Sequence, residues 1–249
     1  MSDIIFGRNS VEEAFRSGKE IEKVYMLNSM RGEFEVFVRN ICREKSVPLA
    51  KVPEQKLAEL CGSKAAHQGV AALISKLHYA DYRDVISSAY ERGGTPFVIM
   101  LDSVTDIRNI GAIARSAWFF GADGIILTGN ISGSISEDAV KSSAGAILNI
   151  PVSREKSVFT AISDLQAMGL KVVATALKTS LSPAECDLHG PLAILMGSEE
   201  KGLHYKVLEV ADEAVRIPSG NDFDSLNVSV AAGILLYEAK RQRMSATSK

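Results

Sequence analysis

The amino-acid sequence predicts an α/β protein in which a small N-terminal α/β domain precedes a larger domain built on a mainly parallel sheet. From Pro96 onward, apolar segments of strand length alternate with segments of helical periodicity. Continuous apolar strands separated by helices are typical of a parallel sheet that is covered on both faces. The 249 residues, 46% of them hydrophobic, suffice for two modest domains that each bury a core.

The first predicted domain, residues 1–76, alternates short helices and strands. Ser10-Val-Glu-Glu13 fits a capping box, so Asn9 or Ser10 is expected to cap a first helix that stops at Gly18. The following elements are expected to be a strand over 21–27, a helix over 34–41, a strand over 47–52, a short helix opened by Pro53 and a strand over 70–74.

Residues 77–95 are expected to link the domains, with a helix over about 82–90. This stretch has no clear core strand, and Arg92-Gly-Gly-Thr-Pro96 interrupts regular structure. The larger domain, residues 96–249, is predicted to contain strands over 97–101, 124–127, 172–176, 192–196 and 214–217, and helices over 109–120, 158–168 and 228–243.

The composition excludes several classes of protein. The net charge of −2 argues against a general nucleic-acid coat, which is usually strongly basic. The three cysteines, Cys42, Cys61 and Cys186, are far apart and have no histidine at a ligand spacing, so we expect reduced core thiols and no metal site. No uncharged apolar run approaches the roughly 18 residues of a membrane span. No secretion signal is apparent, so a cytoplasmic protein is expected.

The charge is distributed unevenly along the chain. Residues 1–80 carry 12 basic and 10 acidic side chains, whereas residues 81–249 carry 16 basic and 20 acidic ones. The net charges are therefore +2 and −4. This difference favours the first segment as the one that faces an anionic partner.

Three post-strand loops of the larger domain are candidates for a functional site, because ligands of open α/β sheets bind beyond the carboxyl ends of the strands. They cover residues 102–115, 197–202 and 217–229. The second has the glycine spacing of a Walker A loop, but Leu203-His204 replaces the required Lys-Ser/Thr. The glycine-rich dinucleotide fingerprint and the nucleophile elbow of serine hydrolases are also absent from the sequence.

Taken alone, each loop has a purely structural interpretation. Asn109 can cap a helix, residues 197–202 can form a charged turn, and Ser225 and Asn227 can start the last helix. The combination of the three loops favours a functional interpretation.

Together, these segments resemble the three motifs of the SpoU (TrmH-type) RNA ribose 2′-O-methyltransferases of the SPOUT superfamily. The motif N-x-G-A-I-x-R is matched by Asn109–Arg115, G-x-E-x-x-G-L by Gly197–Leu203, and I-P-x(6)-S-L-N-V-S-x-A by Ile217–Ala231. Residues 6–14 and 67–70 resemble the family's N-terminal RNA-substrate-binding domain. The two-domain layout is most like that of the bacterial 23S rRNA guanosine 2′-O-methyltransferases.

The resemblance implies methyl transfer from S-adenosylmethionine to a ribose 2′-hydroxyl of RNA, with 23S ribosomal RNA as the expected partner. It also implies a homodimer, a C-terminal trefoil knot and no metal. It places the cofactor contacts at Gly197, Ile217 and Leu226, the RNA contacts at Arg8 and Asn9, and the catalytic roles at Asn109, Arg115, Glu199, Ser225 and Asn227.

The family assigns activation of the ribose hydroxyl to the arginine of the first motif, here Arg115. A guanidinium stays protonated in proteins. Stabilisation of the developing alkoxide, with a forked grip on a neighbouring phosphate, is therefore physically easier than a role as general base. Asn109 and Glu199 are expected to orient this arginine and the nucleotide. Ser225 and Asn227 are expected to position phosphate or ribose at a helix start.

Two alternative functions stay open at this point. The first is a tRNA ribose 2′-O-methyltransferase, although that group usually carries basic terminal helices and the C-terminal cluster here is only Lys240, Arg241 and Arg243. The second is a catalytically silent RNA-binding factor for ribosome assembly. All three motifs keep their polar side chains, which favours an enzyme.

The last predicted helix bears on the dimer. Residues 228–237 are apolar on nearly every face, and such a helix must be covered all round. One face can lie on the sheet while another meets a second subunit, with Ala232 expected at the interface.

Overall fold

The computed structural model describes residues 4–45, 47–62, 65–74, 79–129, 137–221 and 225–246. The chain divides into two compact units, one made mostly of residues before Tyr79 and the other mostly of residues from Tyr79 onward. Each unit has its own sheet and its own core.

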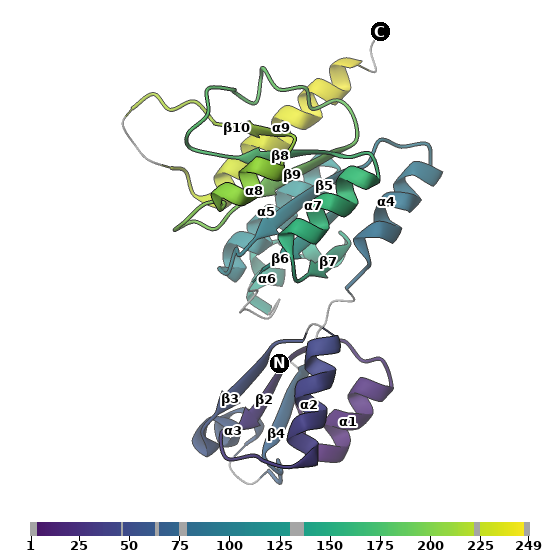
Figure 1. Cartoon of the computed structure of the whole chain (residues 1–249), viewed down its shortest axis with the longest axis vertical. Helices are drawn as coiled ribbons and strands as arrows, with labels where there is room; N and C mark the ends of the chain where they lie inside the picture. Colours follow the sequence, from purple (N-terminus) through teal and green to yellow (C-terminus); the bar gives the residue numbers. More distant parts are fainter. Residues whose placement is uncertain are drawn as a thin grey trace. The chain divides into compact units, whose positions relative to one another are not determined.

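The N-terminal unit contains a four-stranded sheet (Figure 1). Its strands, in the spatial order β1-β4-β2-β3, are β1 (Ile4–Phe6), β4 (Val70–Ile74), β2 (Ile21–Leu27) and β3 (Leu49–Val52). β4 pairs antiparallel with β1 and β2, and β2 pairs parallel with β3. The helices are α1 (Arg8–Arg16), α2 (Glu33–Glu44) and α3 (Glu54–Cys61). Val11 of α1 and Val38 of α2 are fully buried against Val24 of the sheet.

The first helix does not begin at the predicted capping box. It begins at Arg8, and the N-cap residue is Gly7. The φ of 90° at Gly7 favours glycine, which has no side chain that could cap the helix. The side chain of Gln68 supplies the acceptor instead, because its Oε1 accepts a hydrogen bond of 3.0 Å from the Arg8 backbone N–H. The predicted cap at Asn9 or Ser10 is wrong because this acceptor comes from a distant part of the chain, which a local pattern cannot reveal.

The second unit is built on a six-stranded sheet in which every strand pairing is parallel, as the sequence predicts. The spatial order is β10-β8-β9-β5-β6-β7. The strands are β5 (Phe97–Asp102), β6 (Gly124–Thr128), β7 (Val152–Glu155), β8 (Lys171–Thr175), β9 (Leu192–Met196) and β10 (Glu213–Val215). β9 comes late in the sequence but lies in the middle of the sheet, between β8 and β5.

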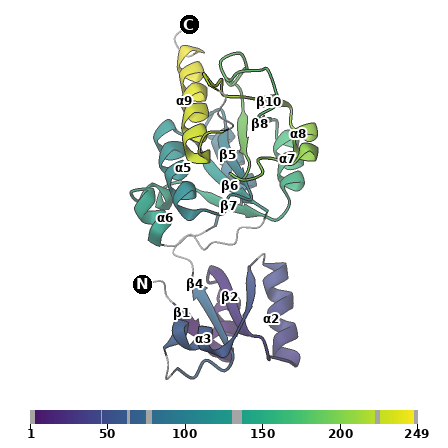
Figure 2. The same cartoon turned by 90° about the vertical axis from the view of Figure 1, so that its left-hand side faces the viewer.

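Helices cover both faces of this sheet (Figures 1 and 2). One face carries α4 (Tyr82–Glu91), α7 (Val158–Ala167) and α8 (Tyr205–Val210), whose buried side chains share a core with the strands. The other carries α5 (Ile107–Phe120) and α9 (Val228–Ala246), which pack on each other. α6 (Glu137–Ser142) and a short 3-10 helix (Ala146–Leu148) lie near α5.

Gly111 allows α5 to approach α6 closely. A Cβ atom at this position would overlap the Ser142 hydroxyl and lie 2.7 Å from the Ala139 carbonyl oxygen. The glycine of the first motif is therefore required by packing.

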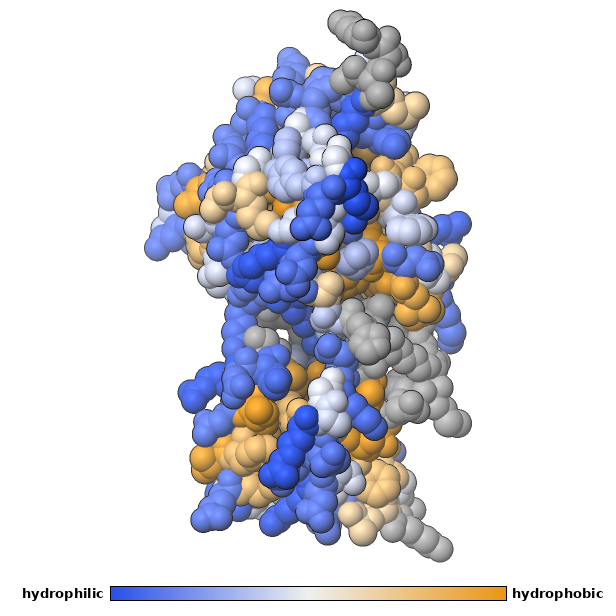
Figure 3. Space-filling model, turned by 90° about the vertical axis from the view of Figure 1, so that its right-hand side faces the viewer, coloured by the Kyte–Doolittle hydropathy of each residue, from blue (hydrophilic) through white to orange (hydrophobic). Residues whose placement is uncertain are grey.

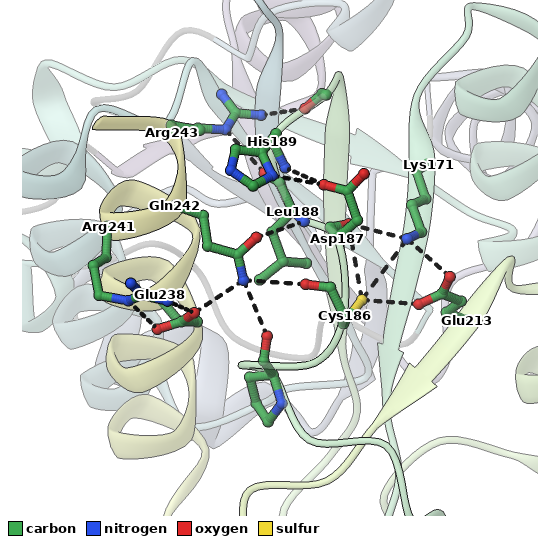
Figure 4. A network of polar contacts seen from close by, with 12 residues as sticks. Lys171, Cys186, Asp187, Leu188, His189, Glu213, Glu238, Arg241, Gln242 and Arg243 are labelled. Atoms are coloured by element: carbon green, nitrogen blue, oxygen red, sulfur yellow. Dashed lines mark hydrogen bonds and ion pairs between the residues drawn. The ribbon is translucent and has the colours of Figure 1, made fainter. Parts of the chain in front are cut away.

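Polar contacts fix the end of α9 to the segment between β8 and β9 (Figure 4). The buried amide of Gln242 donates to the carbonyl oxygens of Pro183 (3.2 Å) and Cys186 (3.1 Å) and accepts a bond of 3.0 Å from the Leu188 N–H. A buried amide needs such partners, because leaving it unpaired costs about 1–3 kcal/mol. The last helix is thus tied to residues 183–188.

A second set of contacts continues this network through Cys186. Its thiol donates to Glu213 Oε2 (2.9 Å), and Lys171 forms an ion pair of 2.9 Å with the same carboxylate. Burial raises the pKa of the Cys186 thiol to about 12, so the thiol stays protonated and structural. All three cysteines are free, and the prediction of core thiols is confirmed for Cys42 and Cys186, which are buried, but is wrong for Cys61, which is only half-buried.

The surface mixes polar and apolar side chains. Figure 3 shows apolar patches among hydrophilic residues on the visible face of each unit. Within the described part of the chain, no helix has the length and apolar character that a membrane crossing needs.

Candidate active site

The first two candidate loops leave the same edge of the sheet. β5 and β9 are neighbouring parallel strands, with Leu101 opposite Met196, so the segments that follow them begin side by side. The segment after β5 leads into α5. The segment after β9 forms a tight turn that is closed by a hydrogen bond of 2.8 Å from the Gly202 N–H to the Ser198 carbonyl.

The cap of α5 is Asp106. Its carboxylate accepts a hydrogen bond of 2.8 Å from the Arg108 backbone N–H, and this bond lowers the pKa of Asp106. The alternative interpretation of Asn109 as the cap is therefore wrong. Asn109 lies in the first turn of the helix, where its side chain is available to reach another loop. Asp106 went unnoticed in the sequence, although an aspartate three residues before Asn109 is a typical helix-start signal.

One side chain from each loop meets in a single hydrogen-bond network. Asn109 Nδ2 donates to Glu199 Oε1. Asn227 Nδ2 lies 3.2 Å from both Asn109 Oδ1 and Glu199 Oε1 and can donate to either. The structure therefore joins residues that are up to 118 positions apart in the sequence.

Asn227 also connects this network to the last helix. Its Oδ1 accepts hydrogen bonds from the Ser229 backbone N–H (2.9 Å) and hydroxyl (2.6 Å) at the start of α9. The helix start and the network are thus held by opposite ends of one amide group.

Arg115 stands apart from this network. It lies on α5, is exposed, and makes no hydrogen bond or ion pair with any residue that the structure describes. Asn109 and Glu199, which were expected to orient this arginine, instead bond to each other and to Asn227. The guanidinium is therefore available to a bound ligand.

The remaining candidates of this unit lie in the two loops that supply Glu199 and Asn227. Gly197 is buried, and its α-carbon packs directly on the backbone of Gly202 and Leu203. Ile217 is half-buried, whereas Ser225 and Leu226 are exposed, Leu226 by 48%. These positions supply backbone groups and apolar side chains on the loops that carry Glu199 and Asn227.

Arg8 and Asn9 belong to the N-terminal unit. Both are exposed in the first turn of α1, and the Arg8 guanidinium lies 5.3 Å from the centre of the Phe34 ring.

None of the described residues form a group of three or more His, Cys, Asp or Glu side chains that could hold a metal ion. The polar atoms that converge at the network are amide and carboxylate groups bonded to one another. The arrangement is a hydrogen-bond network of side chains from three loops, and Arg115 lies on the helix that carries its first member, Asn109.

Sequence profiles of known families match both units. The profile described as the SpoU rRNA methylase family matches residues 96–237, which include all three loops. The chain belongs to this family. A second profile, described as RNA 2′-O ribose methyltransferase substrate binding, matches residues 4–80. This SpoU methylase is therefore an RNA methyltransferase, with S-adenosylmethionine as its methyl donor.

Relatives of this SpoU methylase cover nearly its whole length. It is 32% identical over 242 residues to the putative TrmH family tRNA/rRNA methyltransferase YacO of Bacillus subtilis, covering 97% of this chain and 96% of the relative. The solved structure of an AdoMet-bound rRNA methyltransferase from Sinorhizobium meliloti has 28% sequence identity and a TM-score of 0.61. The match covers 96% of this chain and 87% of that one. The structure of the SpoU methyltransferase AviRb from Streptomyces viridochromogenes with AdoMet has 26% sequence identity and a TM-score of 0.61. The match covers 98% of this chain and 91% of that one.

The residues around the network fit this cofactor. S-adenosylmethionine presents an apolar-faced adenine with polar edges, and such groups are held by backbone donors and acceptors together with apolar side chains. Gly197, Ile217 and Leu226 offer both, on two loops that lead to the network. These three residues are the ones we expect to hold it.

Replacing Gly197 with alanine is expected to lower the affinity for S-adenosylmethionine at least tenfold. The added methyl group would overlap the carbonyl carbon of Gly202 and lie 2.5 Å from the Leu203 nitrogen, so the turn must open. Isothermal titration calorimetry measures the loss. Gly190→Ala is the matched control, because no atom lies within 4 Å of a Cβ there. Unchanged affinity in the Gly197 variant would contradict the assigned position of the cofactor.

Proposed function

We propose that this enzyme methylates a ribose 2′-hydroxyl of ribosomal RNA, with a guanosine of 23S rRNA as its target. The observation that carries the proposal is the meeting of Asn109, Glu199 and Asn227 in one network, while Arg115, on the helix that carries Asn109, is engaged by no described residue. The match of residues 4–80 to a ribose methyltransferase substrate-binding profile supports the ribose as acceptor.

Arg115 is the group that acts on the reacting hydroxyl. A ribose hydroxyl becomes nucleophilic as it loses its proton to water, and the developing negative charge is stabilised by a nearby permanent cation. A guanidinium does not accept that proton, so Arg115 holds the alkoxide and an adjacent phosphate through its forked donors. When bound, S-adenosylmethionine supplies the electrophilic methyl group.

Asn109, Glu199 and Asn227 act as positioning residues. The Glu199 carboxylate faces donors from both amides, and each asparagine oxygen faces a donor as well. Because these side chains use their hydrogen-bonding groups on one another, they hold the three loops in place. The contact with RNA is then left to Arg115 and the exposed Ser225. This division refines the catalytic role expected for all five residues.

A direct test measures transfer from radiolabelled S-adenosylmethionine to purified rRNA and tRNA. Digestion of the product to nucleosides should yield 2′-O-methylguanosine from the 23S fraction. The B. subtilis relative is named for both tRNA and rRNA, so label in tRNA alone would favour the tRNA enzyme. Binding of the cofactor without transfer to either RNA would favour the ribosome-assembly role.

We also propose that the enzyme is a homodimer through α5 and α9. α9 buries Ala232 and Leu236 completely within one chain, so the expectation of Ala232 at the interface is wrong. The same helix exposes Ile234 by 38% and Tyr237 by 55%. A hollow of about 460 Å³ follows this face and is lined by Phe119, Phe120, Tyr237, Lys240, Arg241, Met244 and Ser245. An apolar surface of this kind is typical of a protein interface.

The double substitution of Ile234 and Tyr237 by aspartate is expected to yield monomers, because two charges would be buried without partners at the interface. Light scattering at micromolar concentration measures the mass. Phe159→Asp is the control, because Phe159 is 46% exposed on α7, on the other face of the sheet. A monomeric unmodified protein with full activity would refute the dimer.

A further inference from the structure

Tyr205 is an exposed aromatic residue directly after the loop of the second motif. Its side chain is 59% exposed although it begins α8. The helix instead buries Val207, which is 2% exposed and belongs to the core of the sheet. Tyr205 is therefore not needed to fill the core, and burying a large aromatic surface would be favourable for a ligand.

Two neighbours hold the ring in an organised surface. The His204 ring lies with its centre 4.5 Å from that of Tyr205, at an interplanar angle of 37°. Lys206 Nζ lies 6.0 Å from the centre of the same ring. The three consecutive residues combine an aromatic face with a cation, which is the composition of surfaces that bind single-stranded nucleic acids.

This surface lies next to the candidate active site. Ser198 and Gly202 form a bridge that brings the two ends of the turn together, and Glu199 lies within that turn. Three residues of extended chain span at most about 11 Å. Tyr205 is therefore within the reach of a nucleotide that neighbours the one bound at the network.

The charge balance around Tyr205 indicates that base stacking, and not phosphate binding, is the source of RNA affinity at this surface. Residues 197–206 contain two acidic residues, Glu199 and Glu200, and two lysines, Lys201 and Lys206. This balance gives no strong attraction for phosphate, whereas base stacking does not depend on net charge.

We propose that Tyr205 stacks on an unpaired base next to the methylated nucleotide, so that the enzyme selects single-stranded or loop RNA. His204 supports the ring, and Lys206 lies beside the backbone of that nucleotide. The inference rests on the proposed RNA ribose substrate and adds the structural class of RNA that fits it. Splayed bases that stack on aromatic side chains are the usual mode of recognition of unpaired RNA.

The test compares Tyr205→Ala with Tyr205→Phe in the full-length protein. Loss of a stacked base lowers RNA affinity by roughly 5- to 150-fold, so the KM for an rRNA transcript should rise by that factor in the alanine variant. The kcat and the affinity for S-adenosylmethionine should stay unchanged. The phenylalanine variant keeps the ring and should retain the original KM.

Tyr90→Ala is the matched control for loss of an exposed tyrosine. Tyr90 is 40% exposed, and its hydroxyl donates to the Met168 carbonyl, which precedes β8 and so lies at the amino end of the sheet, away from the candidate site. Direct binding of an end-labelled single-stranded oligoadenylate is measured in parallel at low and high salt. The loss of oligoadenylate affinity in Tyr205→Ala should be similar at both salt concentrations, because stacking is less sensitive to salt than phosphate contacts are.

Each outcome decides the proposal separately from the enzymatic activity. An unchanged KM and an unchanged oligoadenylate affinity in Tyr205→Ala would overturn the stacking role while leaving the methyltransferase assignment intact. An equal loss in Tyr205→Phe would also overturn it, because the ring would then not be the element recognised. If the unmodified protein transfers no methyl group to any RNA, the oligoadenylate arm alone still supports or refutes the stacking surface.

Discussion

Arg115→Ala is expected to abolish methyl transfer while leaving the fold and the affinity for S-adenosylmethionine nearly unchanged. The guanidinium is exposed and bonds to no described residue, so its removal leaves no buried group unpaired. Removal of one donor to a developing negative charge typically slows a reaction by about 100- to 1,000-fold. Single-turnover rates with saturating RNA measure the loss, with the melting temperature and calorimetric cofactor binding as checks on folding.

Arg115→Lys should also fail, because an ammonium is a point donor and cannot hold an alkoxide and a phosphate through one planar fork. Arg108→Ala is the control for charge, since Arg108 lies on the same helix with its side chain 80% exposed and should show a much smaller loss. Substantial turnover by the lysine variant would show that the planar, two-pronged donor geometry of arginine is not required.

Deletion of residues 1–76 is expected to leave a protein that binds S-adenosylmethionine but has lost most of its affinity for RNA. The six-stranded sheet and its core contain no residue of the deleted segment, so the remaining unit keeps its own stabilising contacts. That unit carries the net negative charge, whereas the deleted segment is positive. RNA binding measured at several salt concentrations should lose about 0.7 in the salt slope for each phosphate contact removed, which is the value for single strands.

Point variants in the full-length protein separate RNA binding from folding. Arg8→Ala is expected to weaken RNA binding with little change in melting temperature, because its side chain is exposed and lies only over the Phe34 ring. Methylation of rRNA by the truncated protein at the rate of the intact chain would show that the N-terminal unit has a structural role instead.

The parallel sheet was predictable because buried parallel strands are continuous apolar runs, such as Leu192–Met196. The strand β7 escaped prediction because its four residues, Val152–Glu155, lie at the sheet edge and two of them are charged. The helix α8 has only six residues, too few for a helical period to stand out. The start of α1 depended on Gln68, a long-range contact that local patterns do not contain.

The site was predictable as a set of residues but not as a geometry. The motifs pointed to Asn109, Glu199 and Asn227, yet the bonds among them join positions 28 to 118 residues apart. The mechanism that the family resemblance implies expected Glu199 to orient Arg115 and the nucleotide, whereas the fold pairs Glu199 with the two asparagines. Short-range capping rules could have found Asp106, but only the structure shows that it leaves Asn109 free to cross to another loop.

The dependence of the site on the last helix has a consequence for synthesis of the protein. Asn227 completes the network just before α9 begins, and Gln242 near its other end ties the helix to residues 183–188. Contacts that span so much of the chain form late, because their loops must close first. A nascent polypeptide therefore cannot complete the network of Asn109, Glu199 and Asn227 until translation has released its final segment, and chains truncated before residue 227 lack the third member of the network entirely.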